Sequence, residues 1–294
     1  MKNLQELLAL HYVYPLTFNK FQQLEGQVGS IQNIIHLSSI NLAKILSVST
    51  KNAEKILYNY KHLMKVNLKE AYNSANINVI PYFSEYYPKK LLEINNAPTM
   101  LYAKGDIALL KCPLKLAIIG SRKATNYSRL AMDYIVPPLI EQNCVIVSGL
   151  AKGADSLAHT STIKYGGKTI AVLGHGLFHI YPKENKQLAE EIAENHLLLT
   201  EYPPYVGVQK WHFPSRNRII SGISDALIVT EAALKSGTLI TTELALESGK
   251  DVFAVPGPIH SQQSMGTNSL IKEGAIPIWN GHQIIEEMKM FFRK

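Results

Sequence analysis

Six apolar runs alternate with segments of helical length after Pro113, and this alternation constrains the fold more than any other feature. The runs are Lys115–Gly120, Cys144–Gly149, Thr169–Gly174, His196–Tyr202, Asp225–Ala232 and Asp251–Gly257. Because each run is apolar throughout, it fits a strand of a parallel sheet that is covered on both faces. The sequence therefore predicts an α/β fold with a doubly wound, mostly parallel sheet, whose ligands bind beyond the carboxyl ends of the strands.

Two prolines interrupt the segment between the first two runs. Pro137 and Pro138 fall where a helix is expected. Proline lacks the backbone N–H, and its ring clashes with the carbonyl four residues earlier. We therefore expect this helix to be kinked or split.

The first part of the chain has a helical pattern instead. From Leu4 to Ala71, apolar residues recur at spacings of three and four, and Ser49 or Thr50 is expected to cap a helix. Two strand candidates follow, Asn78–Phe83 and Met100–Ala103. A chain of 294 residues is long for one domain. We predict a small all-helical domain over residues 1–72 and a larger α/β domain over residues 73–294.

Cysteine usage and the lengths of the apolar runs indicate the compartment. Cys112 and Cys144 form no CxxC motif, which excludes a recognisable zinc or redox site and is typical of a reducing compartment. The N-terminal residues lack the features of a signal peptide, and no apolar run approaches the length of a membrane span. We expect a cytoplasmic protein without membrane contact.

Loops rich in small residues follow the predicted strands and carry basic side chains. Glycines let backbone N–H groups approach an anion, and the positive end of the next helix adds to this attraction. Tight turns alone would explain the glycines. They would not explain the bases in the same segments, which are Arg122, Lys152, Arg216 and Arg218. We infer a phosphate-binding surface at one rim of the sheet.

The known motifs for nucleotide cofactors do not occur. The segment YGGKT lacks the first glycine of a P-loop and precedes a strand, where a P-loop would follow one. The segment GSRKAT is not GxGxxG, and no acidic residue follows the second strand at the spacing that binds a ribose. We expect no nucleotide cofactor, and no metal ion because no acidic metal-binding cluster is evident.

Candidate acid–base residues are few. Asp155 and His159 stand four residues apart on one predicted helix, where they can pair across a turn. We favour a structural role for this pair, because no nucleophile or metal ligand accompanies it. One of Glu201, Glu231 and Glu243 is expected to cap a glycine loop. No catalytic residue is predicted.

Several motifs together resemble one known family. In chain order, GSRKATNYS, VSGLAKGADSLAH, TIAVLGHGLFHIYP, TEYPP, FPSRNRIISG, KSGTLITTE and GTNSLIKEGA are similar to the DNA-processing protein A family, also called DprA or Smf. The resemblance runs over residues 79–278. It implies an extended Rossmann-like fold and a homodimeric single-stranded-DNA-binding protein of natural transformation. Such a protein protects incoming DNA, loads the RecA recombinase onto it and has no established enzymatic activity.

Two features depart from the family pattern. Ser47-Val48-Ser49 stands where a helix-hairpin-helix would carry a Gly-hydrophobic-Gly turn, so DNA binding by that turn is not expected. The sequence ends soon after Gly257, which leaves too little chain for the C-terminal winged-helix domain of many members. We therefore expect a member without that domain.

The resemblance implies a DNA-binding site residue by residue. Arg122 would pair with a phosphate, while Gly120 and Ser121 present backbone N–H groups. Arginine suits this role because it makes planar, two-bond contacts with phosphate that lysine cannot make. The other residues implied beside the glycine loops and the PSRNR segment are Gly149, Lys152, Gly153, Arg216, Asn217, Arg218, Gly237 and Thr238.

An aromatic residue is expected to stack on a base in this site. Lys210 and Phe213 resemble the family's lysine and stacking aromatic, and Trp211 is near enough in sequence to compete for that role. Arg216 and Arg218 have an alternative, structural role, in which they cap carbonyl groups or pair with Glu201.

Two other functions stay open. The segment SGTLITTE loosely resembles the PGGxGTxxE motif of LOG-type nucleoside-monophosphate phosphoribohydrolases. Lys235 and Ser236 precede Gly237 here, and Thr241 stands where the motif has its glutamate, which argues against glycosidic cleavage. A nucleotide-sensing module on the same fold is the other alternative.

The last segment, NGHQIIEEMKMFF, is predicted to be an amphipathic helix. Its apolar face of Ile284, Ile285 and Met288 would be buried against a partner or against the protein's own sheet.

Overall fold

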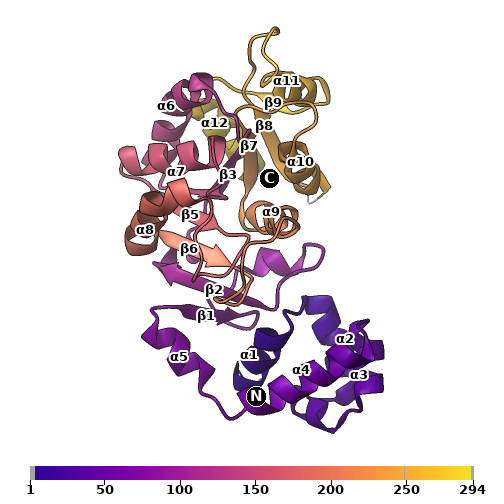
Figure 1. The fold of residues 1–294 in the computed structure, drawn as a ribbon. Coiled ribbons are helices and arrows are strands. Elements are labelled where there is room, and N and C mark those ends of the chain that lie inside the picture. Colours follow the sequence, from indigo (N-terminus) through magenta and orange to yellow (C-terminus); the bar gives the residue numbers. More distant parts are fainter. Residues whose placement is uncertain (1–3, 248, 293–294) are drawn as a thin grey trace.

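The computed structural model describes residues 4–247 and 249–292. The N-terminal part is helical: α1 (Leu4–Val13), α2 (Phe18–Val28), α3 (Ser39–Leu46), α4 (Thr50–Leu63) and α5 (Leu68–Ser74), with a 3-10 helix at Ile31–His36. These helices lie at one end of the molecule, below the sheet in Figure 1. Ser49 caps α4, because its hydroxyl accepts a hydrogen bond from the Asn52 N–H at 3.3 Å. The helical prediction for this part is confirmed.

The turn between α3 and α4 closes without glycine. Ser47 has a φ of +55°, the left-handed conformation in which helices usually end on glycine. The Val48 N–H then bonds the Ala43 carbonyl at 3.0 Å. A helical hairpin therefore forms although the Gly-hydrophobic-Gly turn is missing.

Among the described residues, nine strands form one sheet in the order β1-β2-β6-β5-β4-β3-β7-β8-β9. They are β1 (Asn78–Pro81), β2 (Met100–Gly105), β3 (Lys115–Ile119), β4 (Val145–Ser148), β5 (Lys168–Val172), β6 (Leu197–Thr200), β7 (Ala226–Val229), β8 (Asp251–Ala254) and β9 (Ile276–Pro277). Strand β2 runs antiparallel to both its neighbours, and all other neighbours are parallel. The predicted doubly wound, mostly parallel sheet is confirmed, and each of the six apolar runs forms one strand.

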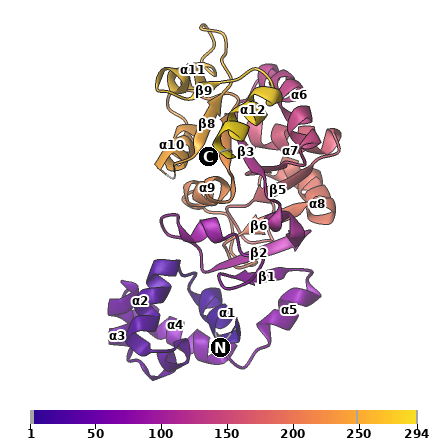
Figure 2. The same ribbon diagram turned by 180° about the vertical axis from the view of Figure 1, so that it is seen from behind.

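Helices cover both faces of the parallel strands (Figures 1 and 2). They are α6 (Asn126–Glu141), α7 (Ala154–Lys164), α8 (Lys186–Asn195), α9 (His212–Ile223), α10 (Gly237–Glu247), α11 (Met265–Lys272) and α12 (Gly281–Phe292). In β3, Ala117 and Ile119 share a core with α9, α10 and α11, whereas Leu116 and Ile118 share another with α6, α7 and α12. Burial on both faces explains why the strand is apolar at every position.

The helix is not split at Pro137 and Pro138, so this alternative of the prediction was wrong. Helix α6 runs without a break through both prolines to Glu141. The prolines stand near its C-terminal end, and Val136, Pro138 and Leu139 are buried there. Burial of this apolar turn against the core outweighs the backbone hydrogen bonds that the prolines cannot make.

The apolar face of α12 packs inside the protein. Ile284 and Met288 are buried in the core that also contains α6 residues, and Ile285 packs against that core. Of the two alternatives for this face, burial against the protein's own sheet layer is therefore the one observed.

Contacts join the helical part to the sheet. The His11 ring on α1 lies within hydrogen-bond distance of the Tyr102 hydroxyl on β2, at 3.1 Å, and the Phe18 N–H bonds the Ala97 carbonyl at 2.7 Å. One continuous core extends from the helices to the sheet. The division into domains at residue 72 stays a prediction. No helix in the described part of the chain is long and apolar enough to cross a membrane.

Candidate nucleic-acid interface

The sheet has a switch point between β3 and β7. From β3 the chain continues to β4 on one side, whereas β7 flanks β3 on the other. Ligands of open α/β sheets bind where the strand order reverses in this way. A cavity of about 560 Å³ lies there. Its wall includes most of the predicted DNA-binding residues, namely Gly120, Ser121, Arg122, Phe213, Arg216, Asn217, Gly237 and Thr238. We call this wall and its mouth the rim site.

Glu231 anchors the loop that follows β3. Its carboxylate accepts hydrogen bonds from the Thr125 N–H at 2.6 Å, the Thr125 hydroxyl at 2.8 Å and the Ser128 hydroxyl at 2.9 Å. Thr125 in turn caps α6. The expectation that one glutamate caps a glycine loop is confirmed for Glu231, and these bonds hold the backbone on which Arg122 is carried.

Arg122 lies exposed at the mouth of the cavity. Its guanidinium carbon lies 5.4 Å from the centre of the Phe213 ring. It forms no ion pair with any other described residue, so its hydrogen-bond donors are available to an anion. The Phe213 ring is half-buried and also contacts the Tyr181 ring, at 5.5 Å between centres. A cation and an aromatic face are thus presented side by side.

The loop after β4 packs directly on the loop after β3. Gly153 has a φ of +76°, and a side chain there would overlap the Ser121 carbonyl. The next amide, Ala154 N–H, donates to that carbonyl at 3.1 Å. Lys152, in the same loop, points to solvent and pairs with Glu184. The predicted Gly153 therefore shapes the rim site, while Lys152 lies outside its wall.

Arg216 is buried and holds the ends of two strands. Its guanidinium donates to the carbonyls of Gly149 and Val172, and its Nη2 lies 3.9 Å from Asp155 Oδ2. Its Nε donates to Asn217 Oδ1 at 3.0 Å. This is the carbonyl-capping alternative considered for the arginine, and a guanidinium so engaged supports the loops from behind.

Asn217 and Thr238 tie the neighbouring elements together. The Asn217 amide donates to Thr241 Oγ1 at 2.7 Å and thereby joins α9 to α10. The Thr238 hydroxyl donates to the Gly120 carbonyl at 3.1 Å. Gly237 begins α10 in open space, where an added Cβ would meet nothing within 4 Å. The three predicted residues lie together, but the side chains of Asn217 and Thr238 are occupied by structural bonds.

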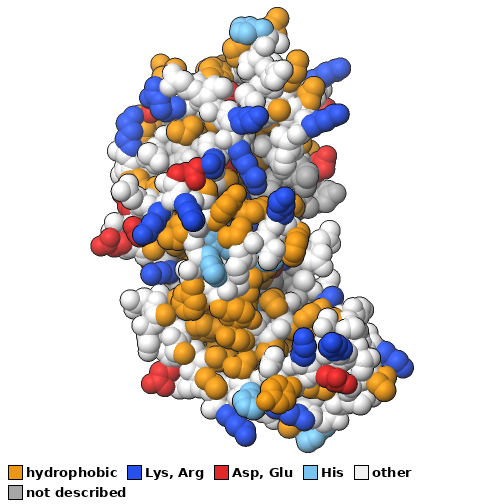
Figure 3. All heavy atoms as spheres, in the orientation of Figure 1, with side chains coloured by type: hydrophobic (Ala, Val, Ile, Leu, Met, Phe, Trp, Pro, Cys, Tyr) orange, Lys and Arg blue, Asp and Glu red, His pale blue; other side chains and the backbone are white. Residues whose placement is uncertain are grey.

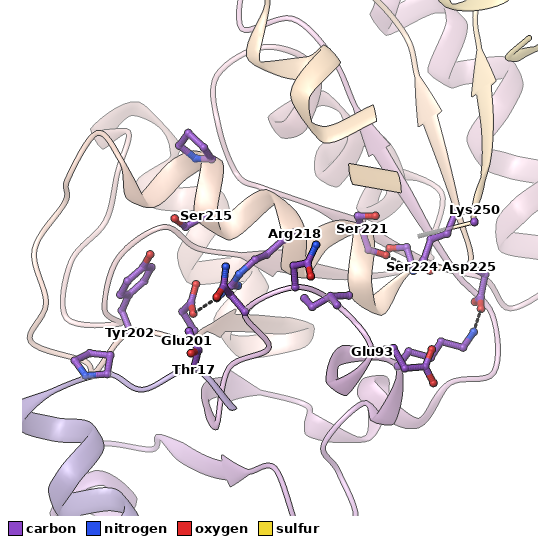
Figure 4. Close-up of a pocket in the computed structure, with 17 residues that line it drawn as sticks. Thr17, Glu93, Glu201, Tyr202, Ser215, Arg218, Ser221, Ser224, Asp225 and Lys250 are labelled. Carbon is purple, nitrogen blue, oxygen red and sulfur yellow. Dashed lines mark hydrogen bonds and ion pairs between the residues drawn. The ribbon is translucent and has the colours of Figure 1, made fainter. Parts of the chain in front are cut away.

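Arg218 points away from the rim site. It lines a second cavity of about 980 Å³ on another side of α9, and its Nη2 bonds Glu201 Oε2 at 2.5 Å (Figure 4). Arg218 and Glu201 side chains are only 13% and 12% exposed. Burial raises the pKa of Glu201, and the Arg218 charge opposes this rise. The predicted alternative of a pair with Glu201 is therefore the arrangement observed.

The predicted pairing of Asp155 with His159 was wrong. His159 Nδ1 lies 2.7 Å from Thr169 Oγ1, and because that hydroxyl donates to the Ile146 carbonyl, the ring N–H must be the donor to Thr169. Asp155 instead accepts from the Ala151 N–H at 3.3 Å. Burial lowers the pKa of His159 to about 3 and raises that of Asp155. Asp155 turns toward Arg216 because it stands in the first turn of α7, beside the loop.

The segment before α9 presents a lysine and an indole to solvent. Lys210 is exposed, and Trp211 is 67% exposed immediately before the first residue of α9. Neither lines the rim cavity, whereas Phe213 does. The geometry brings Phe213, and not Trp211, next to Arg122.

Sequence reasoning missed Tyr181. Its ring, 44% exposed, continues the aromatic surface from Phe213, and the exposed Lys183 follows two residues later. The available signal was the loop GHGLFHIYPKEN, in which Phe178 and Tyr181 stand close to a lysine. No group of three or more His, Cys, Asp or Glu residues that could hold a metal ion occurs in the described ranges.

Comparison with known proteins gives a consistent result. The family model of DNA recombination-mediator protein A matches residues 78–289. DNA processing protein DprA of Bacillus subtilis is 44% identical over 218 residues, which are 74% of this chain and 73% of the relative. DprA of Streptococcus pneumoniae is 44% identical over 225 residues, 76% of this chain and 79% of the relative.

Two solved structures are similar over much or nearly all of the chain. The X-ray structure of DprA from Streptococcus pneumoniae has a TM-score of 0.81 at 36% identity and covers 98% of this chain and 99% of its own. A structure of DNA processing protein A from Helicobacter pylori, described for its unique single-stranded DNA binding mode, has a TM-score of 0.66 at 34% identity, covering 73% and 96%. The family resemblance of the motifs is thus confirmed, and the chain belongs to the DNA recombination-mediator protein A family, the DprA family.

Proposed function

We propose that this protein binds single-stranded DNA at the rim site with little sequence preference. The observation that carries the proposal is Arg122 over Phe213 at the mouth of the switch-point cavity. A free guanidinium suits a phosphate, and an accessible aromatic ring suits an unstacked base. Single strands offer both groups at once, whereas the bases of a duplex are already stacked on one another.

The relatives support this proposal. The Helicobacter pylori protein, 34% identical, is described as binding single-stranded DNA. The site residues proposed for contact with DNA are Gly120, Arg122, Gly153, Lys152, Lys210 and Phe213. Ser121 would only shape the site, because the backbone N–H that was expected to face an anion donates instead to the Glu231 carbonyl at 2.7 Å. Gly149, Arg216, Asn217, Gly237 and Thr238 would shape the same site, and Arg218 would act only through the fold.

The proposal extends to a role after binding. By membership of a family of recombination mediators, we expect the protein to act as a homodimer in the cytoplasm of a transformable cell, to protect incoming DNA and to load RecA onto it. We propose no catalysis. The buried Thr241 stands where a phosphoribohydrolase would need a carboxylate, and the Glu231 carboxylate is occupied by three hydrogen bonds.

A pair of assays tests the proposal against its alternatives. Fluorescence anisotropy should give tighter binding of oligo(dT) than of a blunt duplex of equal length, in EDTA and without ATP. Release of ribose 5-phosphate from AMP should stay at the level of the buffer. Equal affinity for single strand and duplex would contradict the DNA proposal, and release of ribose 5-phosphate would favour the phosphoribohydrolase.

A further inference from the structure

A row of accessible aromatic rings starts at Phe213 in the rim site and extends away from that site. Phe213 contacts Tyr181, whose ring is tilted by 44° to it. Phe178, in the same loop as Tyr181, is 60% exposed. A phenylalanine so exposed adds little to the core, since most of its surface still meets water. The same loop therefore exposes two aromatic rings, Phe178 and Tyr181, which a ligand can contact.

Backbone hydrogen bonds fix this loop to the segment after β6. The Phe178 N–H donates to the Pro204 carbonyl at 2.9 Å, and the Gly176 N–H donates to the Val206 carbonyl at 2.8 Å. These bonds place the exposed Tyr205 next to the loop that carries Phe178. Phe178 and Tyr205 both stand on loops, and these bonds hold the backbones of the two loops together.

Tyr205 carries the aromatic line on to the helical part. Its ring lies 4.5 Å from that of Tyr12, next to α1's buried core, and its hydroxyl donates to the Tyr12 carbonyl. Figure 3 shows hydrophobic side chains gathered over the middle of this face, with Lys and Arg side chains around the upper part. The aromatic line, defined as Phe213, Tyr181, Phe178, Tyr205 and Tyr12, therefore links the sheet to the N-terminal helices.

The charges beside the aromatic line fit a polyanion. Lys183 follows Tyr181 by two residues, Lys210 precedes Phe213 by three, and both are exposed. The acidic Glu184 of the same loop is paired with Lys152. Aromatic rings also occur in protein–protein interfaces. Rings accompanied by exposed lysines are, in addition, the combination that binds the bases and the backbone of a single strand. Continuity with Arg122 and Phe213 points to the same occupant.

We propose that a bound single strand continues from the rim site along the aromatic line toward α1, with successive bases stacked on Tyr181, Phe178 and Tyr205. This inference rests on the proposed function. It adds that the affinity depends on the length of the strand, because a short oligonucleotide fills the rim site and only a longer one reaches Phe178 and Tyr205.

The test compares a dT hexamer with a dT 20-mer on the full chain by fluorescence anisotropy. Phe178→Ala should weaken binding of the 20-mer about tenfold and leave the hexamer within about twofold of the wild-type protein. Phe178→Trp keeps an aromatic face and should restore the affinity for the 20-mer. Tyr134→Ala removes a similarly exposed ring on α6 and serves as the matched control.

The possible results distinguish a failure of the aromatic-line proposal from a failure of the rim-site proposal. If Phe178→Ala binds the 20-mer like the wild-type protein, or weakens both lengths equally, the aromatic line is refuted while the rim site stands. If the wild-type protein binds neither length, the proposed function itself fails. A 20-mer carrying a single 5-iodouracil beyond the rim site should also photocrosslink to Phe178 or Tyr205, and crosslinks confined to the rim site would overturn the proposal.

Discussion

The guanidinium carbon of Arg122, in the loop after β3, lies 5.4 Å from the centre of the Phe213 ring on α9. The two residues are far apart in sequence, and the parallel pairing of β3 with β7 brings their elements to one edge of the sheet. A ligand that engages both must carry a negative charge and a flat apolar face within a short distance, which a nucleotide unit does.

Two replacements of Arg122 should distinguish the contribution of its charge to DNA binding from that of its planar geometry. Arg122→Ala should weaken oligo(dT) binding and lower the slope of log affinity against log salt by about 0.7, because one phosphate contact is lost. Arg122→Lys should recover the slope but only part of the affinity, since an ammonium lacks the planar two-bond geometry. Anisotropy titrations at several salt concentrations measure both quantities.

The melting temperature of Arg122→Ala is the control for that experiment. Since Arg122 is exposed, its loss should leave the melting temperature unchanged. A variant that melts earlier but keeps the wild-type salt slope would show that Arg122 only supports its loop.

Phe213 should contribute more to stacking than Trp211. Phe213→Ala should lose about 1–3 kcal/mol of oligo(dT) binding free energy, the usual value of one base–aromatic stack. Trp211→Ala should lose less, because Trp211 does not line the rim cavity.

Fluorescence gives a direct check on the same question. In a Trp279→Phe variant, Trp211 is the sole tryptophan of the sequence. Weak quenching of this variant by oligo(dT) is expected, and strong quenching would assign the stacking role to Trp211.

Removal of Arg218 should affect folding and not DNA binding. Arg218→Ala leaves Glu201 buried without its partner, which typically costs about 3–5 kcal/mol of the free energy of unfolding. Urea denaturation measures this loss, and adding Glu201→Gln should recover part of it by removing the unpaired charge. A stable Arg218→Ala protein with weakened oligo(dT) binding would place Arg218 at the DNA after all.

Acid should destabilise the fold through two buried histidines. Burial lowers the pKa values of His11 and His159 to about 3 each. Between pH 6.5 and pH 3 the unfolded chain therefore binds protons that the folded protein does not bind. The free energy of unfolding should fall as the pH falls through this window, by up to about 1.4 kcal/mol per pH unit for each histidine.

The variant His159→Asn tests the assignment. Its amide can still donate to Thr169 but cannot titrate, so the dependence of stability on pH between 6.5 and 3 should be shallower than in the wild-type protein. An unchanged dependence would mean that other groups cause the acid sensitivity.

Much of the fold could be predicted from local pattern. Strands such as β3 are apolar at every position because both faces are covered, and that pattern is visible without a structure. The effect of Pro137 and Pro138 could not be predicted, because burial of the end of α6 overrides a local preference against proline. The tertiary contacts that bury this turn cannot be predicted from a window of a few residues.

The site was predicted less completely, because the sequence does not show in which direction each side chain leaves its helix. Arg216, Asn217 and Arg218 are consecutive on α9, and a helix turns by about 100° per residue. Arg216 therefore reaches back under the strand ends, Asn217 joins α9 to α10, and Arg218 lines the second cavity. Sequence reasoning recognised that these residue types matter, but it could not assign each side chain to a side of the helix.

Gly149 and Arg216 constrain each other across 67 residues of chain. A Cβ at position 149 would overlap the guanidinium atoms of Arg216, so the absence of a side chain at one position is what makes room for the largest cation at the other. The effect of a substitution at position 149 therefore depends on the residue at position 216. An alanine at 149 should be far less damaging once Arg216 has been shortened, so a chain that has lost Arg216 no longer needs a glycine at 149 for this reason.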